Sequence, residues 1–362
     1  MRVVIAPDGF GGVLPASAVA EAIAEGWRRV RPTDELELRP VSDGGEGLLD
    51  VLARDGDATV EVEVAGPHGH PLHAPLLLRE DGTAVVESAL ACGLALVPEE
   101  QRSPMPATTY GVGQLIDAAR GAGAQRIVVG LGGSASVDGG TGALNGLGFR
   151  LRVEDGSGLK VGGADLHQVR RVEPTWVADF GGVDVELLAD VDVVLADAAP
   201  LFGPQKGATP EQVEQLTQAL EGWADVAERD LDAAGLREHP GAGAAGGLGF
   251  GLAVGLDAPL VDGAARVAEL VGLERALMSA DLVVTGEGRL DVTSLRGKVV
   301  GYLLEAASEH RLPVQAVVGQ VEPDAAGALD DVEAASPRGP GEDPWADAAA
   351  AASRLAERVE GP

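Results

Sequence analysis

The sequence contains very little cysteine and very little lysine. Its single cysteine, Cys92, excludes an internal disulfide framework and a cysteine-rich zinc site, and its apolar surroundings favour a core residue. Among 27 Lys+Arg residues only three are lysines, Lys160, Lys206 and Lys298. Lys206 and Lys298 lie in glycine-bearing loops, where a compact ammonium group suits contact with phosphate. Chance retention of three lysines is the alternative interpretation.

Long apolar runs and a positive charge balance are also absent. No stretch reaches membrane-spanning length, and the first apolar run is too short for a signal peptide, so we expect a cytoplasmic protein without a membrane partner. The formal net charge of −30 argues against nucleic acid as a partner, because its phosphates would be repelled. A hydrophobic content of 45% over 362 residues is typical of a globular chain with about two domains.

The pattern of apolar runs predicts an α/β fold with two domains. Short runs at residues 3–6, 127–129, 282–284 and 314–318 predict buried parallel strands, most of them followed by glycine-rich loops. From Thr59 onward, valines alternate with glutamates, which predicts antiparallel hairpins. We therefore expect residues 1–58 plus 270–362 to form a parallel-sheet domain, Rossmann- or flavodoxin-like. Residues 59–269 would form a mixed α/β domain inserted into it.

The stretch 281–298 is the strongest candidate site. Its apolar strand is expected to stop at Gly286, and the loop beginning there would carry Glu287, Arg289, Asp291 and Lys298. In an open α/β sheet, ligands bind outside the carboxyl ends of the strands. The stretch therefore predicts a ligand-binding loop.

Other expected strands also end in acidic residues. Asp8 follows the first strand, and Asp43 and Glu46 follow the second. Each aspartate taken alone would more often be a helix cap or a turn residue, so the argument for a site is their repetition at strand ends. Asp190 and Asp192 finish another strand, and side chains two apart on extended backbone face the same side. That pair could hold Mg²⁺ or accept a proton.

A glycine-rich loop over residues 130–142 leads into an expected helix. Backbone N–H groups at a helix start can cradle an anion without a cation, although a glycine-lined turn without a ligand remains open. The loop is not a Walker motif, because no Gly-x4-Gly-Lys-Ser/Thr occurs in the chain. Residues 241–246 match G-x-G-x-x-G, but His239 and Pro240 stand where a strand is required, so the dinucleotide interpretation is weak.

These motifs together resemble the type I glycerate kinase family over nearly the whole chain. The matching segments are residues 6–8, 43–47, 132–135, 138–140, 190–192, 202–208, 241–247 and 285–291. The resemblance implies ATP-dependent phosphorylation of D-glycerate to 2-phosphoglycerate, with the active site in a cleft between the two domains. The chain would be a diverged member, because several loop residues differ from those usual in the family: Gly9, Gly11, Val137, Val193 and Arg296.

The resemblance also suggests roles for individual residues. We expect Asp190 and Asp192 to bind Mg²⁺ or accept the hydroxyl proton, and Lys206 and Lys298 to neutralise phosphate or the substrate carboxylate. The residues expected to bind ATP phosphates are Gly132, Gly133, Ser134, Gly139 and Gly140. The residues expected to bind substrate are Asp8, Asp43, Glu46, Asp138, Glu287, Arg289 and Asp291.

Two other functions are compatible with the sequence. The first is a diverged kinase for another small hydroxy acid or polyol, because Gly9, Gly11 and Val137 would enlarge the pocket. The second is a ligand-binding paralogue without catalysis. The expected ligands are a small hydroxy acid and ATP with Mg²⁺, and self-association into a homodimer is left open.

Overall fold

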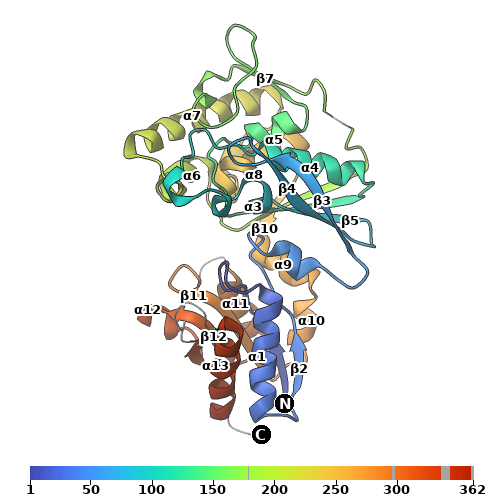
Figure 1. The fold of residues 1–362 in the computed structure, drawn as a ribbon, viewed down its shortest axis with the longest axis vertical. Helices are drawn as coiled ribbons and strands as arrows, with labels where there is room; N and C mark the ends of the chain where they lie inside the picture. Colours follow the sequence, from blue (N-terminus) through green and yellow to red (C-terminus); the bar gives the residue numbers. More distant parts are fainter. Residues whose placement is uncertain (178, 296–297, 336–342, 360–362) are drawn as a thin grey trace. The chain divides into compact units, whose positions relative to one another are not determined.

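A computed structural model describes residues 1–177, 179–295, 298–335 and 343–359 (Figure 1). The chain divides into two compact units. Unit 1 comprises Met1–Asp43, Asp50–Leu52 and Ala264–Pro362, and unit 2 comprises Gly44–Leu49 and Ala53–Gly263. The chain thus passes between the units near residues 43–53 and again at 263–264. The sequence analysis placed these divisions at 58/59 and 269/270.

Unit 1 contains a five-stranded sheet in the order β13-β12-β11-β1-β2. All four neighbouring pairs are parallel, and the apolar runs predicted this for β1, β11 and β12. The strands are β1 (Arg2–Ile5), β2 (Glu35–Leu38), β11 (Leu282–Leu290), β12 (Val314–Val321) and β13 (Asp331–Ala334).

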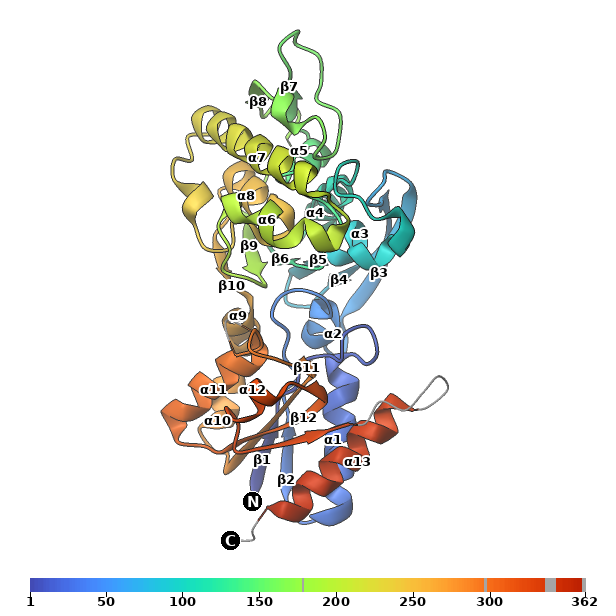
Figure 2. The ribbon, with the colours of Figure 1, turned by 90° about the vertical axis from the view of Figure 1, so that its left-hand side faces the viewer.

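Helices α1 (Ala16–Val30) and α13 (Pro344–Arg358) pack side by side in unit 1 (Figure 2). Gly26 permits this close approach, because a Cβ there would lie 2.0 Å from the carbonyl oxygen of Ala349. The two helices share a hydrophobic core with alternate residues of β1, Val3 and Ile5. The other helices of this part are α2 (Leu48–Leu52), α9 (Gly263–Leu270), α10 (Leu273–Leu277), α11 (Val299–His310) and α12 (Pro323–Ala326).

The expected loop start at Gly286 is wrong, because strand β11 continues to Leu290. Its second half pairs with β12 from Gly286, opposite Val317, to Leu290, opposite Val321. The glycine is required by this pairing, since a Cβ at Gly286 would lie 2.4 Å from the carbonyl oxygen of Val317. Glu287 and Arg289 are therefore held on a strand rather than in a loop.

Unit 2 contains a six-stranded sheet in the order β10-β9-β6-β5-β4-β3. The β3–β4 and β4–β5 pairs are antiparallel, which confirms the hairpins expected after Thr59, and the remaining pairs are parallel. The strands are β3 (Ala58–Ala65), β4 (Pro71–Leu78), β5 (Thr83–Glu87), β6 (Arg126–Leu131), β9 (Asp184–Ala189) and β10 (Leu260–Asp262). A separate two-stranded hairpin is formed by β7 (Arg150–Arg152) and β8 (Arg171–Glu173).

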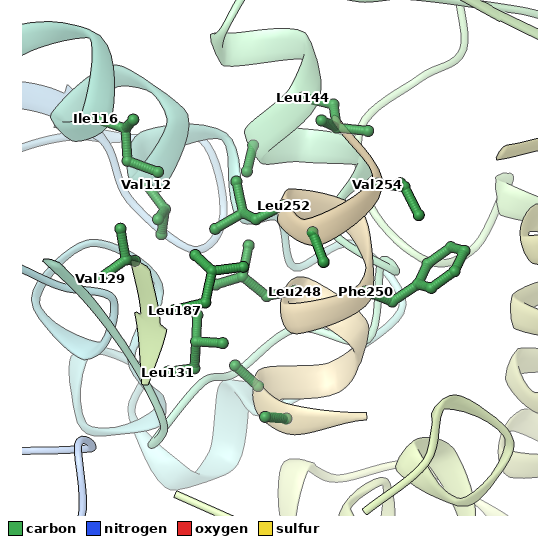
Figure 3. Packing of buried hydrophobic residues seen from close by; sticks show 14 of the residues in the cluster. Val112, Ile116, Val129, Leu131, Leu144, Leu187, Leu248, Phe250, Leu252 and Val254 are labelled. Carbon is green, nitrogen blue, oxygen red and sulfur yellow. The ribbon is translucent and has the colours of Figure 1, made fainter. Parts of the chain in front are cut away.

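The core of unit 2 lies between its sheet and its helices (Figure 3). Leu187 of β9 and Val129 of β6 pack towards Leu248 and Leu252 of α8 (Ala244–Leu256). Helix α7 (Pro210–Asp230) begins after Thr209, which accepts a hydrogen bond from the backbone N–H of Gln212 in a capping box. The other α-helices are α3 (Ala89–Cys92), α4 (Tyr110–Gly121), α5 (Thr141–Gly146) and α6 (Ala198–Phe202).

Short 3₁₀ helices connect several of these elements. They comprise Leu94–Leu96, Glu99–Gln101, Leu166–Gln168, Leu195–Asp197, Pro204–Lys206 and Leu236–Glu238. Among the described residues, no helix is both long enough and apolar enough to cross a bilayer.

Candidate functional site

A polar pocket in unit 2 lies at the carboxyl ends of β6 and β9. The loop after β6, the turn after β9 and the segment from the end of α6 onward contribute most of its lining, and single residues come from before α2, from the 3₁₀ helix Leu94–Leu96 and from the start of α8. Its lining residues are Glu46, Leu94, Gly133, Ser134, Asp190, Val191, Phe202, Gln205, Lys206 and Ala245. This is the edge of a parallel sheet at which ligands bind in open α/β folds.

Lys206 is the central cation of the pocket. It is only 3% exposed, and its Nζ donates hydrogen bonds to the Oγ of Ser134 at 2.9 Å and to the carbonyl oxygen of Ser136 at 2.8 Å. An ammonium group carries three N–H donors, so two of them fix the glycine-rich loop after β6. The geometry joins a predicted catalytic residue to a predicted phosphate-binding residue, Ser134.

The pKa of Lys206 is lowered to about 8. Burial is the main cause, because a charged ammonium group loses its hydration inside the protein. The nearby Cys92, Asp190 and Asp138 oppose this shift. Lys206 is therefore a cation at neutral pH that loses its proton in mildly alkaline solution.

Two neighbouring glycines bring the backbone close to two carboxylates. A Cβ at Gly132 would lie 2.7 Å from Oδ2 of Asp190, and a Cβ at Gly133 would lie 2.6 Å from Oε1 of Glu46. Gly133 also has a φ of +59°, which a residue with a side chain rarely adopts. Glycine at both positions therefore allows the carboxylates of Asp190 and Glu46 to lie next to the loop that Lys206 fixes.

Asp190 and Asp192 do not share one environment. Strand β9 ends at Ala189, so the alternation of an extended strand does not apply to them. Asp190 lines the pocket and interacts electrostatically with Lys206, whereas Asp192 is exposed and is not among the lining residues. Within the described part of the chain, no group of three or more His, Cys, Asp or Glu side chains is arranged to hold a metal ion.

Asp138, expected to bind substrate, is completely buried and does not line the pocket. Its carboxylate accepts backbone hydrogen bonds from Thr109 at 2.9 Å, Gly140 at 3.1 Å and Gly142 at 3.2 Å. Burial raises its pKa, and these hydrogen bonds oppose that shift. The carboxylate holds the start of α5 to the segment before α4.

Gly139 and Gly140 also serve packing rather than the pocket lining. A Cβ at Gly139 would lie 2.6 Å from Cδ1 of Trp223, and a Cβ at Gly140 would lie 2.8 Å from Cα of Gly251. Trp223 Nε1 donates a 2.9 Å hydrogen bond to the carbonyl oxygen of Gly139. The predicted phosphate loop therefore divides into a pocket-lining part at residues 133–134 and a part packed against α7 and α8.

A second group of predicted residues gathers in unit 1. Asp8, Asp43, Glu287 and Lys298 interact electrostatically with one another. The pKa of Asp8 is raised well above its usual value, first by burial and then by Asp43 and Glu287, although the N–H of Gly9 donates to it at 2.6 Å. The cluster therefore combines carboxyl groups with a single described ammonium group.

Glu287 is a second acid of this cluster whose pKa is strongly raised. Burial raises its pKa to about 7, and the carboxylates of Asp291 and Asp43 add to this, while Ser294 and Lys298 oppose it. Its Oε1 is buried and has no hydrogen-bond partner in the described structure. Such a group is suited to exchange a proton near neutral pH.

Of the remaining predicted residues, Asp291 and Arg289 lie nearer the surface of unit 1. Asp291 accepts hydrogen bonds from the backbone N–H of Thr293 at 2.7 Å and of Ser294 at 3.3 Å. Arg289 is exposed and pairs with Glu322. Arg289 also interacts electrostatically with Asp291, and its exposed side chain is not buried with Asp8 and Glu287.

The residues that depart from the family's usual pattern do not all face the candidate site. Val137 is completely buried in the unit 2 core, and Val193 packs beside Gly243. Gly9 lies close to Leu14, whereas Gly11 has open space around it and a φ of +28°. Arg296 and the adjoining Gly297 lie outside the described residues.

Sequence reasoning assigned no role to several lining residues, including Leu94, Gln205 and Ala245. Ala245 has a φ of +52°, which is uncommon for a residue with a side chain, and Gly246 and Gly247 share its left-handed conformation. The glycines of residues 241–247 were the available signal. These glycines do not form a dinucleotide-binding motif, since the segment leads into α8 without a preceding strand.

Comparison with known proteins gives consistent matches. Residues 3–360 match the profile described as the glycerate kinase family. The chain is 41% identical over 333 residues to glycerate kinase of Bacillus subtilis (strain 168), covering 90% of this chain and 86% of that protein. It is 37% identical over 336 residues to glycerate 2-kinase of Escherichia coli (strain K12), with 90% and 86% covered.

A solved structure gives the same result. The crystal structure of a protein described as a glycerate kinase 2 from Salmonella typhimurium LT2 matches with a TM-score of 0.85 and 36% sequence identity. The match covers 99% of this chain and 97% of that chain.

Proposed function

Because this chain belongs to the glycerate kinase family of phosphotransferases with an alcohol acceptor, we propose that it phosphorylates D-glycerate at the 2-hydroxyl, with ATP as donor. The observation that carries the proposal is the buried ammonium group of Lys206. It is fixed to Ser134 in a pocket at the carboxyl edge of a parallel sheet, beside Asp190.

Unit 2 has the features that bind the donor phosphates. Phosphoryl transfer depends on positioning and on charge stabilisation, with little covalent chemistry from the protein. Lys206 supplies a positive charge in a water-poor site, where electrostatic interactions are stronger than in bulk water. The backbone at Gly133 and Ser134 can approach the phosphate oxygens closely because Gly133 has no side chain.

Mg²⁺ fits the oxygen ligands of the same pocket. Asp190 and Glu46 each present a carboxylate oxygen beside adjacent glycines, and Mg²⁺ in kinases is held by one or two carboxylates together with substrate phosphates. These two residues would hold the ion, which would neutralise charge on the transferring phosphoryl group. Asp192 is left out of this set because it is exposed.

Unit 1 has the features that bind and deprotonate the acceptor. Glu287, with a pKa of about 7, can accept the hydroxyl proton at physiological pH. Lys298 offers a positive charge for the carboxylate of glycerate. Asp8 and Asp43 can accept hydrogen bonds from the hydroxyl groups of glycerate. That the two clusters form one active site remains a prediction.

Phosphorus NMR tests the reaction and its regiochemistry in one sample. We expect D-glycerate and MgATP to yield ADP and the resonance of 2-phosphoglycerate. Formation of 3-phosphoglycerate would contradict the 2-hydroxyl, and absence of ATP consumption would contradict a kinase. A Lys206→Met variant provides the control for contaminating kinases, and a panel of hydroxy acids and polyols tests the diverged-kinase alternative.

A further inference from the structure

Arg102 is a half-buried arginine without an anionic partner. It follows the 3₁₀ helix Glu99–Gln101, its Nε is buried, and no hydrogen bond or ion pair joins its side chain to any described residue. Comparably buried arginines in this protein are paired: Arg31 with Asp34, and Arg237 with Glu228. A buried guanidinium donor without a partner is costly, so its retention calls for an explanation.

Arg102 packs directly against the segment that carries Lys206. A Cβ at Gly207, the residue after Lys206, would lie 2.3 Å from the carbonyl oxygen and 3.3 Å from the Cβ of Arg102. The preceding 3₁₀ helix, Leu94–Leu96, begins with Leu94, which lines the pocket. The backbone of Arg102 is therefore anchored next to Lys206, and its side chain is not itself among the lining residues.

The charged side chains that line the pocket include more carboxylates than cations, which by itself does not favour a polyphosphate ligand. Its lining residues include two carboxylates, Glu46 and Asp190, and one ammonium group, Lys206. Two N–H groups of Lys206 are already donated to Ser134 and Ser136, which leaves one for a ligand. In several phosphoryl-transfer enzymes an arginine stabilises charge on the transferring phosphoryl group in addition to Mg²⁺ and a lysine.

We propose that Arg102 is a second cation of the unit 2 pocket and binds the terminal phosphates of the nucleotide. Its planar guanidinium group can donate two parallel hydrogen bonds to one phosphate, which an ammonium group cannot do. The inference rests on the proposed function, because it takes a nucleoside triphosphate as the ligand of this pocket.

Calorimetry on the full chain tests the inference with two variants and one control. Arg102→Gln should raise the Kd for MgATP by about 10- to 100-fold, while the Kd for adenosine stays within about threefold. Arg102→Lys should recover part of the loss. Because no described hydrogen bond or ion pair is removed, both variants should keep the wild-type melting temperature.

Arg126→Gln is the matched control. Arg126 is exposed at the first residue of β6, whereas the pocket follows the last residue, about 16 Å away along the strand. This variant removes the same charge from unit 2 and should bind MgATP like the wild type. If it weakens binding as much as Arg102→Gln does, the effect is one of net charge, and the assignment to Arg102 is wrong.

Kinetics separate this inference from the proposed function. If the wild type phosphorylates glycerate and Arg102→Gln has an unchanged Kd for MgATP, the inference fails and the function stands. A rise in the KM for glycerate alone would likewise overturn it, because the contact would be with the acceptor. If the wild type binds MgATP with the expected Arg102 dependence and never turns over, the proposed function fails instead.

Discussion

The Nζ of Lys206 donates a 2.9 Å hydrogen bond to the Oγ of Ser134, although both side chains are buried in unit 2. The bond links residues that are 72 positions apart in the chain. It holds the turn after β6 against the segment after α6. The same atom that would neutralise phosphate therefore also fixes the backbone around it.

The first prediction concerns the alkaline side of the pH profile. Because the pKa of Lys206 is lowered to about 8, the free enzyme should lose the ammonium charge as pH rises through that value. We expect kcat/KM for MgATP to fall above pH 8, and Lys206→Met should be slow at every pH without this dependence. A profile that stays flat to pH 10 would contradict a role for the Lys206 charge.

Stability should change in the opposite direction over the same range. Between about pH 8 and 10.5 the unfolded chain keeps the Lys206 proton and the folded chain has lost it, so the contribution of this group to the free energy of unfolding rises with pH. Urea denaturation of the wild type and Lys206→Met at pH 7.5 and 10 measures this contribution. The gap between the two proteins should shift in favour of the wild type at the higher pH.

The second prediction concerns Glu287 in unit 1. Burial raises its pKa to about 7, so activity should rise with pH through that value, and Glu287→Gln should lower kcat by about 10²- to 10⁴-fold. Below about pH 4.5 the raised pKa contributes fully to stability, and this contribution is lost as pH rises to about 7. At pH 8 the variant should therefore be at least as stable as the wild type.

Thermal melts and initial rates at pH 8 check both halves of this prediction. Glu305→Gln, an exposed substitution on α11 of the same unit, is the control and should change neither quantity. If Glu287→Gln loses activity and melts at a lower temperature than the wild type, the carboxylate has a structural role instead.

Local patterns in the sequence predicted most elements of the fold. The alternation of valines with glutamates after Thr59 predicted antiparallel hairpins, and β3–β4 and β4–β5 are antiparallel, because such alternation is a property of neighbouring residues. Strand β11 was cut short at Gly286, since glycines usually end a strand and only pairing with β12 shows why they are needed here. That pairing joins residues about thirty positions apart, which no local pattern encodes.

The candidate site was only partly predictable for the same reason. Lys206 was singled out by the rarity of lysine, and it lies beside Asp190 in the pocket; its role in catalysis stays a prediction. The resemblance to the kinase family suggested Asp138 as a substrate-binding residue. Its donors come from Thr109 and from the following turn, and that convergence exists only in the folded chain. Arg102 gave no signal, because an unpaired arginine cannot be recognised in a sequence.

The third prediction separates Asp190 from Asp192. Asp190 lines the pocket and Asp192 is exposed, so we expect Asp190→Asn to lower kcat by at least about 100-fold and Asp192→Asn to stay within about threefold. The same assay with EDTA should abolish activity, and added Mg²⁺ should restore it. Equal losses in the two variants would support the pair as joint ligands instead.

The last prediction concerns Asp138, which is buried among backbone donors. One carboxylate oxygen accepts from the N–H of Gly140, and the other accepts from the N–H groups of Thr109 and Gly142. An asparagine would turn its NH₂ group towards one of these donors in either orientation. We therefore expect Asp138→Asn to lower the free energy of unfolding by about 2–4 kcal/mol, measured by urea denaturation.

The exposed Asp117→Asn on α4 serves as the control and should cost well under 1 kcal/mol. Because Asp138 is completely buried in unit 2 and the acceptor is proposed to bind in unit 1, the folded variant should keep the wild-type KM for glycerate at low temperature. A raised KM with unchanged stability would instead make Asp138 a substrate-binding residue.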